Sequence, residues 1–226
     1  MDLVANAHNI AHNVMQGIDP SLAVKYKTLI SFLLEVPAAA PKLKSSESSI
    51  YSEEYISRLA RSFASARNLR APNPPQTVPD KMVSVILHEY FDCEKADLEK
   101  IRIEHALSMG AENLVGDLLE RYLASIIEPL GWVWCSGSTT KAVDFIKSPE
   151  LDHGKWRVLQ VKNRDNSENS SSSAIRAGTN IEKWFRTFSK KEGSNWGNFP
   201  DKGLSNLLSE EKFQEFVIRY LKSLRQ

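Results

Sequence analysis

The chain has 226 residues, of which 42% are hydrophobic and 25% charged, and its formal net charge is +1. These are ordinary values for a globular protein, and the length fits one domain, or one catalytic core that carries a helical extension. The apolar stretches are too short for a membrane span, the N-terminus does not have the pattern of a secretory signal, and the two cysteines lack metal-ligand spacing, so we expect a cytoplasmic protein with reduced thiols.

The N-terminal part of the chain has the apolar periodicity of helices. Apolar residues recur at steps of three and four from Leu22 to Leu33 and again from Ser52 to Phe63, where Ser52 is the expected helix start. The run Ala71–Pro75 is a stiff linker and the best internal boundary. We therefore expect a helical N-terminal region, 1–75, and a second region, 76–226.

Helical periodicity resumes at Val83 and again from Leu98 through Ile127. After Gly131 the period changes, and three short β-prone segments follow between turn residues. These segments are 132–135, 142–146 and 156–162. A helix followed by three strands is the core of many α/β nucleases, so the sequence indicates an α/β fold.

The remainder of the chain alternates between polar and amphipathic segments. Asn163 to Ser173 is rich in Ser and Asn. Thr179 to Glu182 has the pattern of a capping box, which predicts the start of a helix. The apolar face of that helix would consist of Ile181, Trp184, Phe185 and Phe188. A last amphipathic helix is expected from about Glu210 to Leu224.

Positive charge is concentrated in one stretch of the chain. Residues 1–154 carry 15 Lys and Arg against 20 Asp and Glu, whereas residues 155–191 carry 9 against 3. Such an excess is expected of a phosphate-binding surface. A solvated face without a partner is the alternative interpretation.

Three polar side chains are expected to converge where the second and third strands meet. Gln160 and Lys162 share one face of a strand because strand side chains alternate. Asp144 lies between Val143 and Phe145, where a buried strand prefers apolar residues. Burying these groups is costly unless they bind something, and Mg²⁺ prefers oxygen ligands such as these. An ordinary solvent-facing strand that reads Gln-Val-Lys is the alternative.

The spacing Asp-x15-Gln-x-Lys resembles the PD-(D/E)xK nuclease superfamily in its Gln-x-Lys variant. The resemblance implies that Asp144 ligates the metal and that Gln160 fills the second acidic position through its side-chain oxygen. It also implies that Lys162 orients and helps deprotonate the attacking water, and that the backbone carbonyl of Val161 adds a ligand. The sequence departs from the pattern in two ways, because residue 143 is Val rather than Pro and Gln replaces the usual Glu. The neutral ligand leaves the site short of negative charge.

The same superfamily places a Glu on the helix before the first core strand. Glu120 lies eleven residues before Gly131, and Glu112 lies nineteen before it. We take Glu120 as the additional metal ligand and keep Glu112 as a reserve.

A longer stretch, from Ala111 to Trp196, resembles the SinI/AvaII-like type II restriction endonucleases, most specifically from Leu159 to Ser173 and on to Arg186. The resemblance implies a restriction-endonuclease-like core, a central mixed sheet flanked by helices, with 76–226 as the catalytic and DNA-binding part. It further implies a bacterial homodimer that uses Mg²⁺ to cut double-stranded DNA at a short palindrome, GGWCC (W being A or T). A cognate DNA methyltransferase would be its genetic partner.

The residues that follow the proposed metal-binding strand are the candidates for DNA contact, since DNA has to pass over them. Arg164 and Arg176 carry the fork that guanine O6 and N7 accept, and Lys183 and Arg186 suit phosphates. Short hydroxyl and amide side chains bond phosphates and base edges without bulk. Those of this segment are Asn163, Asn166, Ser167, Asn169, Ser170, Ser171, Ser172 and Ser173. A flexible linker is the alternative interpretation of the Ser/Asn run.

Two rival functions remain open on the sequence alone. One is another PD-(D/E)xK nuclease, a repair or modification-dependent enzyme resembling Mrr. The other is a non-catalytic DNA-binding module, in which Gln160 and Lys162 form only a solvated strand face. A digest of unmodified DNA separates the first rival from a restriction enzyme, and Mg²⁺-independent binding without cleavage would support the second.

Overall fold

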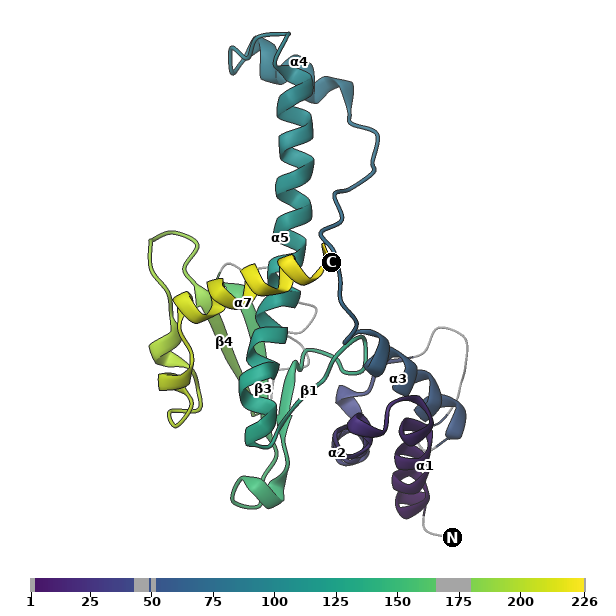
Figure 1. Ribbon diagram of the computed structural model, residues 1–226. Coiled ribbons are helices and arrows are strands. Elements are labelled where there is room, and N and C mark those ends of the chain that lie inside the picture. Colours follow the sequence, from purple (N-terminus) through teal and green to yellow (C-terminus); the bar gives the residue numbers. More distant parts are fainter. Residues whose placement is uncertain (1–2, 43–48, 50–51, 166–179, 226) are drawn as a thin grey trace.

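The computed structural model describes residues 3–42, 49, 52–165 and 180–225, and Figure 1 shows how the elements are arranged. The helices are α1 (Leu3–Ile18), α2 (Ala23–Glu35), α3 (Glu53–Ser65), α4 (Lys81–Glu89), α5 (Leu98–Ile127) and α7 (Glu210–Ser223). The strands are β1 (Trp132–Trp134), β2 (Phe145–Lys147), β3 (Arg157–Arg164) and β4 (Ile181–Thr187). Short 3₁₀ turns are η1 (Pro20–Leu22), η2 (Pro37–Ala39), η3 (Glu128–Leu130), η4 (Pro149–Leu151), η5 (Trp196–Asn198) and η6 (Ser205–Leu207). The α/β fold with a helical N-terminal region is therefore confirmed.

The four strands form one mixed sheet in the order β1-β2-β3-β4. β1 pairs with β2 and β2 with β3 in antiparallel fashion, whereas β3 and β4 are parallel. Since β3 is bonded to a neighbour on each side, its backbone is held along most of its length. Two of the residues that the sequence predicts for the site, Gln160 and Lys162, lie on β3, and a third, Asp144, directly precedes β2.

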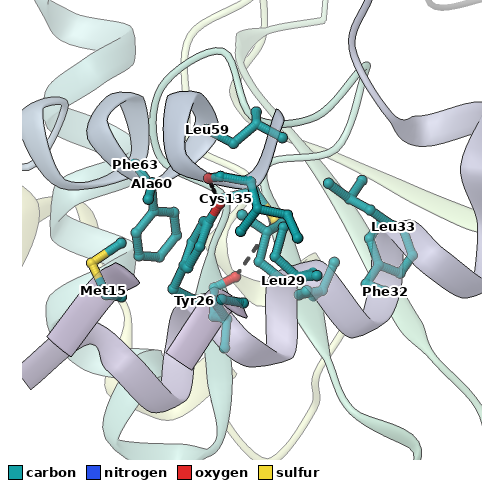
Figure 2. Packing of buried hydrophobic residues seen from close by; sticks show 14 of the residues in the cluster. Met15, Tyr26, Leu29, Phe32, Leu33, Leu59, Ala60, Phe63 and Cys135 are labelled. Carbon is teal, nitrogen blue, oxygen red and sulfur yellow. Dashed lines mark hydrogen bonds between the residues drawn. The ribbon is translucent and has the colours of Figure 1, made fainter. Parts of the chain in front are cut away.

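The three N-terminal helices cover one face of the sheet. Ser52 caps α3 through its hydroxyl, which accepts from the amide of Tyr55 at 3.2 Å, as the sequence predicts. Tyr26 and Phe63 lie fully buried between the helices, with ring centroids 5.4 Å apart (Figure 2). The same apolar cluster continues onto the sheet through Val133, Cys135, Val143, Ile146 and Val158. The N-terminal helices and the sheet thus share a core, and the region boundary that we predict at residue 75 stays a prediction.

The opposite face of the sheet is covered by the C-terminal half of α5, by α7 and by the turns between β4 and α7. Tyr122 of α5 lies at the centre of an aromatic group, with its ring centroid 5.7 Å from that of Trp196 and 5.4 Å from that of Phe213. Phe213 and Tyr220 are buried on α7, which confirms the predicted last helix and its apolar face. Its start is capped by Ser209, whose hydroxyl accepts from the amide of Lys212.

One predicted element is wrong. The sequence predicts a helix that begins near residue 180, but residues 181–187 form β4, parallel to β3. The apolar residues of this segment are spaced as on a helix, yet they are also the β-branched and aromatic types that favour strands. Pairing along β3 overrides the local pattern and buries Trp184 beside Val161. Thr179 of the presumed capping box lies outside the described residues.

α4 and the first turns of α5 project beyond the sheet (Figure 1). The linker before α4 touches α5 at Gly110, where a Cβ would lie only 2.9 Å from the backbone nitrogen of Pro74. Glycine is therefore required at this close approach of linker and helix. Among the described helices, none combines the length and the apolar character needed to cross a membrane.

Candidate active site

Asp144 lies where the ladder between β2 and β3 ends. The last ladder pair is Phe145 with Leu159. Beyond it, the amide of Asp144 donates to the Leu159 carbonyl and its carbonyl accepts from the Cys135 amide, both at 2.9 Å. The amide of Val161, two residues further along β3, donates to Oδ2 of Asp144 at 2.7 Å. The carboxylate thus takes the place of a strand partner and is held at the point where the two strands separate.

Gln160 and Lys162 alternate along β3 with Leu159 and Val161, which are buried in the core on the α5 side. Gln160 is only 2% exposed, and Lys162 is half-buried. As predicted, β2 and β3 are neighbours, so Asp144 stands beside the strand that carries the other two residues. The Gln160 amide is buried, so this part of β3 is not the ordinary solvent-facing strand of the alternative interpretation.

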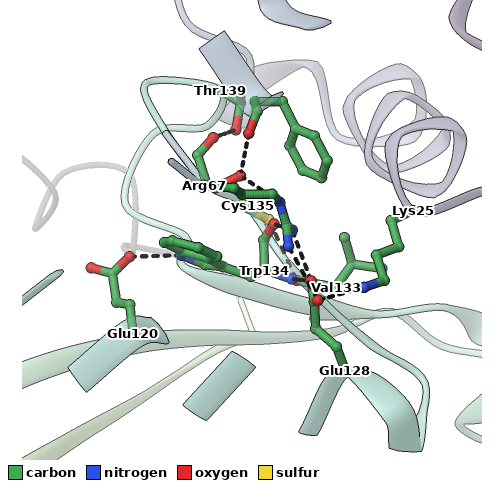
Figure 3. A network of polar contacts seen from close by, with 10 residues as sticks. Lys25, Arg67, Glu120, Glu128, Val133, Trp134, Cys135 and Thr139 are labelled. Carbon is green, nitrogen blue, oxygen red and sulfur yellow. Dashed lines mark hydrogen bonds and ion pairs between the residues drawn. The ribbon is translucent and has the colours of Figure 1, made fainter. Parts of the chain in front are cut away.

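Glu120 reaches the same region from α5. The residues around it on the helix, Leu119 and Leu123, are fully buried and fix the face of α5 that meets the sheet. Glu120 Oε2 accepts a hydrogen bond of 2.8 Å from the indole Nε1 of Trp134 on β1 (Figure 3). Because both elements are packed in the core, the carboxylate is oriented before any ligand arrives.

The pKa values of Glu120 and Asp144 depend on burial and on the charged groups around them. Burial chiefly, and then the charge of Asp144, raises the pKa of Glu120 to about 8, against the Trp134 hydrogen bond and the charge of Lys162. Burial raises the pKa of Asp144 to about 6, against the Val161 amide and Lys162. Two carboxyls that are disfavoured in their charged forms form a place where a cation would be stabilised.

The donors present fit a hard divalent cation. Two carboxylates, the side-chain oxygen of Gln160 and the carbonyl oxygen of Val161 are the oxygen ligands that Mg²⁺ takes. In the described part of the chain no three His, Cys, Asp or Glu side chains gather as a metal-binding group.

Trp134 is held between two guanidinium groups. The central carbon of Arg67 lies 5.0 Å from the Trp134 ring centroid, and that of Arg121 lies 5.4 Å from it. Arg67 also donates to the Trp134 carbonyl at 2.9 Å and to Glu128 at 2.7 Å (Figure 3). Arg121 donates to Asp117 at 2.7 Å and to backbone carbonyls that follow α3. The indole that orients Glu120 therefore has little freedom of its own.

Sequence reasoning does not identify Trp134, Arg67 or Arg121 as part of the site. Trp134 stands in a β-prone run that predicts only a strand, and Arg67 lies more than fifty residues away along the chain. They come together only because α5 and the segment after α3 both contact the end of β1. The one signal in the sequence that could have pointed to Trp134 is its place near the end of the first β-prone run after the helix that carries Glu120.

The acidic candidates on α5 differ in position. Glu112 is exposed, eight residues and hence about 12 Å of helix before the half-buried Glu120. The structure therefore brings Glu120, and not Glu112, next to Asp144 and Lys162.

Of the predicted DNA contacts, four lie in the described residues. Arg164 and Lys183 are exposed, and Asn163 is half-buried with its Oδ1 accepting from Arg186 Nε at 3.0 Å. Arg186 also pairs with Glu210, so its guanidinium joins β3 to α7. The other candidates lie outside the described residues: Asn166, Ser167, Asn169, Ser170, Ser171, Ser172, Ser173 and Arg176.

Comparison with known proteins gives a consistent result. The family model of the SinI restriction endonuclease matches residues 7–223. The type II restriction enzyme Eco47I of Escherichia coli is 52% identical over 220 residues, which are 96% of this chain and 95% of that protein. The type II restriction enzyme SinI of Salmonella infantis is 47% identical over 224 residues, 98% of this chain and 97% of that protein. The chain belongs to the SinI restriction endonuclease family.

Proposed function

We propose that this enzyme is a Mg²⁺-dependent type II restriction endonuclease of the PD-(D/E)xK kind, with its active site at Asp144, Gln160, Lys162 and Glu120. The observation that carries the proposal is the Asp144 carboxylate. It is bound by the Val161 amide at the end of the β2–β3 ladder and lies within the electrostatic influence of Lys162. A backbone carbonyl could accept the hydrogen bond from the Val161 amide equally well. Strand pairing therefore does not explain why a buried acid stands at this position.

Asp144, Glu120, the Gln160 side-chain oxygen and the Val161 carbonyl would hold the metal. When bound, Mg²⁺ stabilises charge that develops on the phosphoryl group and lowers the pKa of bound water. The family of the chain supports this chemistry, and so does the raised pKa of both carboxyls, since a cation offsets their repulsion.

Lys162 supplies the positive charge of the protein itself. Its ammonium carries three donors, and its charge acts to lower the pKa of both Glu120 and Asp144. Lys162 lies on β3, which pairs with a strand on each side. In that position it orients the attacking water and bonds a phosphoryl oxygen. The half-buried environment strengthens both interactions because less water screens them.

The substrate that we propose is double-stranded DNA with the palindrome GGWCC, cut by a two-fold homodimer that offers one active site to each strand. Arg164 is the exposed last residue of β3, and Arg176 comes twelve residues later in the sequence, so they are the guanine-reading candidates. Asn163 and Arg186, which are hydrogen-bonded to each other, lie near the C-terminal ends of β3 and β4, and Lys183 lies opposite Gln160; all three are candidates for contacts with the DNA backbone. A cognate methyltransferase would protect the same sequence in the host.

The first prediction concerns the active site itself. Asp144→Asn and Lys162→Met are each expected to lower cleavage of unmodified plasmid DNA by at least about 1000-fold while leaving DNA binding in place, because they remove charge from the reacting centre. Cleavage is measured on plasmids that contain or lack GGWCC, and binding by gel shift. Glu150→Gln is the control, because it also removes one negative charge, at an exposed position in η4 outside the proposed site.

Three outcomes would contradict parts of the proposal. Cutting near the wild-type rate by either active-site variant would remove that residue from the chemistry. Discrete bands at sites other than GGWCC would change the recognition sequence but not the active site. Cutting of modified DNA alone would favour a modification-dependent nuclease.

A further inference from the structure

The projecting part of the molecule exposes an apolar surface. This arm comprises residues 78–109, that is α4, the loop after it and the first turns of α5 (Figure 1). Every residue of α4 is half-buried or exposed. The large apolar side chains of the arm that expose between 46 and 77% of their surface include Val83, Ile86, Tyr90, Phe91, Ile103 and Leu107.

The extent of this surface matches that of a protein interface. With full surfaces of roughly 200 Å² for large apolar side chains, the stated exposures of these six leave on the order of 700 Å² in water. This is close to the ~800 Å² that one partner contributes to a standard interface. Monomeric proteins rarely leave apolar patches of this size uncovered, because each square ångström costs free energy in water. The arm is therefore expected to be covered in the working assembly.

Charge indicates the kind of partner. Residues 78–109 carry four Lys and Arg against seven Asp and Glu. A net negative arm repels DNA phosphates and anionic lipid surfaces, so neither suits this apolar face. Both signs of charge are present, as in Lys100 and Glu104, so an identical arm can offer complementary groups around the apolar centre.

We propose that the arm is the surface through which two copies of this chain associate about a two-fold axis. The inference rests on the homodimer of the proposed function and names the surface that builds it. α5 runs without interruption from Leu107 of the arm to Glu120 of the active site. Association of the two arms therefore sets the distance between the two active sites, which a two-strand cut requires.

The test measures self-association of the full chain by sedimentation equilibrium. Ile86→Glu on α4 and Leu107→Glu on α5 are each expected to raise the dimer dissociation constant by about 100-fold or more. A two-fold interface loses two buried aliphatic side chains and gains two charges with every such substitution. Val24→Glu is the matched control, since Val24 is 72% exposed on α2, away from the arm, and its variant should associate like the wild type.

Both arm positions are exposed, so the thermal unfolding of each variant at low protein concentration should stay near that of the wild type. The two substitutions lie on different helices, so a local defect in one helix cannot account for both. If both variants dimerise as tightly as the wild type, the arm is not the interface, although a dimeric nuclease still stands. If the wild type itself sediments as a monomer, the proposed arm interface and the two-fold homodimer are both contradicted. The proposed nuclease function is then judged by the cleavage assay, which is measured separately.

Discussion

Gln160 occupies the position where the nuclease superfamily that the sequence resembles carries an acid. It is 2% exposed on β3, at a site where the charge of Asp144 already raises the pKa of Glu120. A third buried carboxylate would add to that repulsion. The Gln160 amide avoids this repulsion, because its oxygen can bind a cation without adding a buried negative charge that destabilises the protein when the metal is absent.

Gln160→Glu tests this account at the residue scale. We expect cleavage in Mg²⁺ to persist, the metal-free protein to lose about 1–3 kcal/mol of stability, and added Mg²⁺ to stabilise the variant more than the wild type. Thermal unfolding with and without Mg²⁺ measures both effects. Gln214→Glu, at an exposed position on α7, is the control and should change neither. Complete loss of cutting in Gln160→Glu would mean that Gln160 does something other than bind the metal.

At the scale of elements, the site depends on how α5 meets β1. The contact is the hydrogen bond from Trp134 to Glu120, and the ring of Trp134 is held by Arg67 and Arg121. In the function that we propose, Glu120 is a metal ligand, and a group that orients such a ligand affects the metal without touching the substrate. Trp134 is therefore a positioning residue for Glu120.

Trp134→Phe keeps an aromatic ring in this place and removes the N–H. We expect the Mg²⁺ concentration for half-maximal cleavage to rise about 10- to 100-fold, with DNA affinity unchanged. Trp132→Phe is a matched control on the same strand, since in the described part of the chain the buried Trp132 Nε1 has no hydrogen-bond partner. Equal changes in the Mg²⁺ requirement of the two variants would show that loss of indole volume, and not the bond to Glu120, is responsible.

At the scale of the whole molecule, Glu128 joins the N-terminal helices to the sheet. Its carboxylate is 8% exposed and accepts from Lys25 of α2 at 2.6 Å, from Arg67 after α3 at 2.7 Å and from the amide of Trp134 on β1 at 3.0 Å (Figure 3). Burial raises the pKa of Glu128, but the hydrogen bonds and charges of Arg67 and Lys25 outweigh it, so the pKa is lowered. The carboxylate therefore stabilises the folded state whenever it is charged.

Glu128→Gln is expected to cost about 3–5 kcal/mol at neutral pH, because it leaves the half-buried Arg67 without its charge partner. A group with a lowered folded pKa contributes stability above its unfolded value, and this contribution is lost as the pH falls through the folded value. The difference between wild type and variant should therefore shrink below a pH of about 4.5, the ordinary value for Glu. Urea unfolding over a pH series measures it, with the exposed Glu150→Gln as control. A difference that does not change with pH would contradict an ionic role.

The sequence by itself predicted most of the local elements and placed Asp144 on the segment next to the strand that carries Gln160 and Lys162; the roles of these three residues stay a prediction. A side-chain cap such as Ser52 marks a helix start because it bonds an amide only one turn away, and Asp144 lies beside the strand of Gln160 and Lys162 because consecutive strands pair as neighbours. Only the tertiary structure decided that residues 181–187 form a strand, since their spacing suits either period until β3 offers a partner.

The bond between Trp134 and Glu120 and the junction at Glu128 were likewise decided by the tertiary structure. Each depends on which faces of distant elements pack together, and periodicity along the chain shows that a face is apolar without showing what covers it.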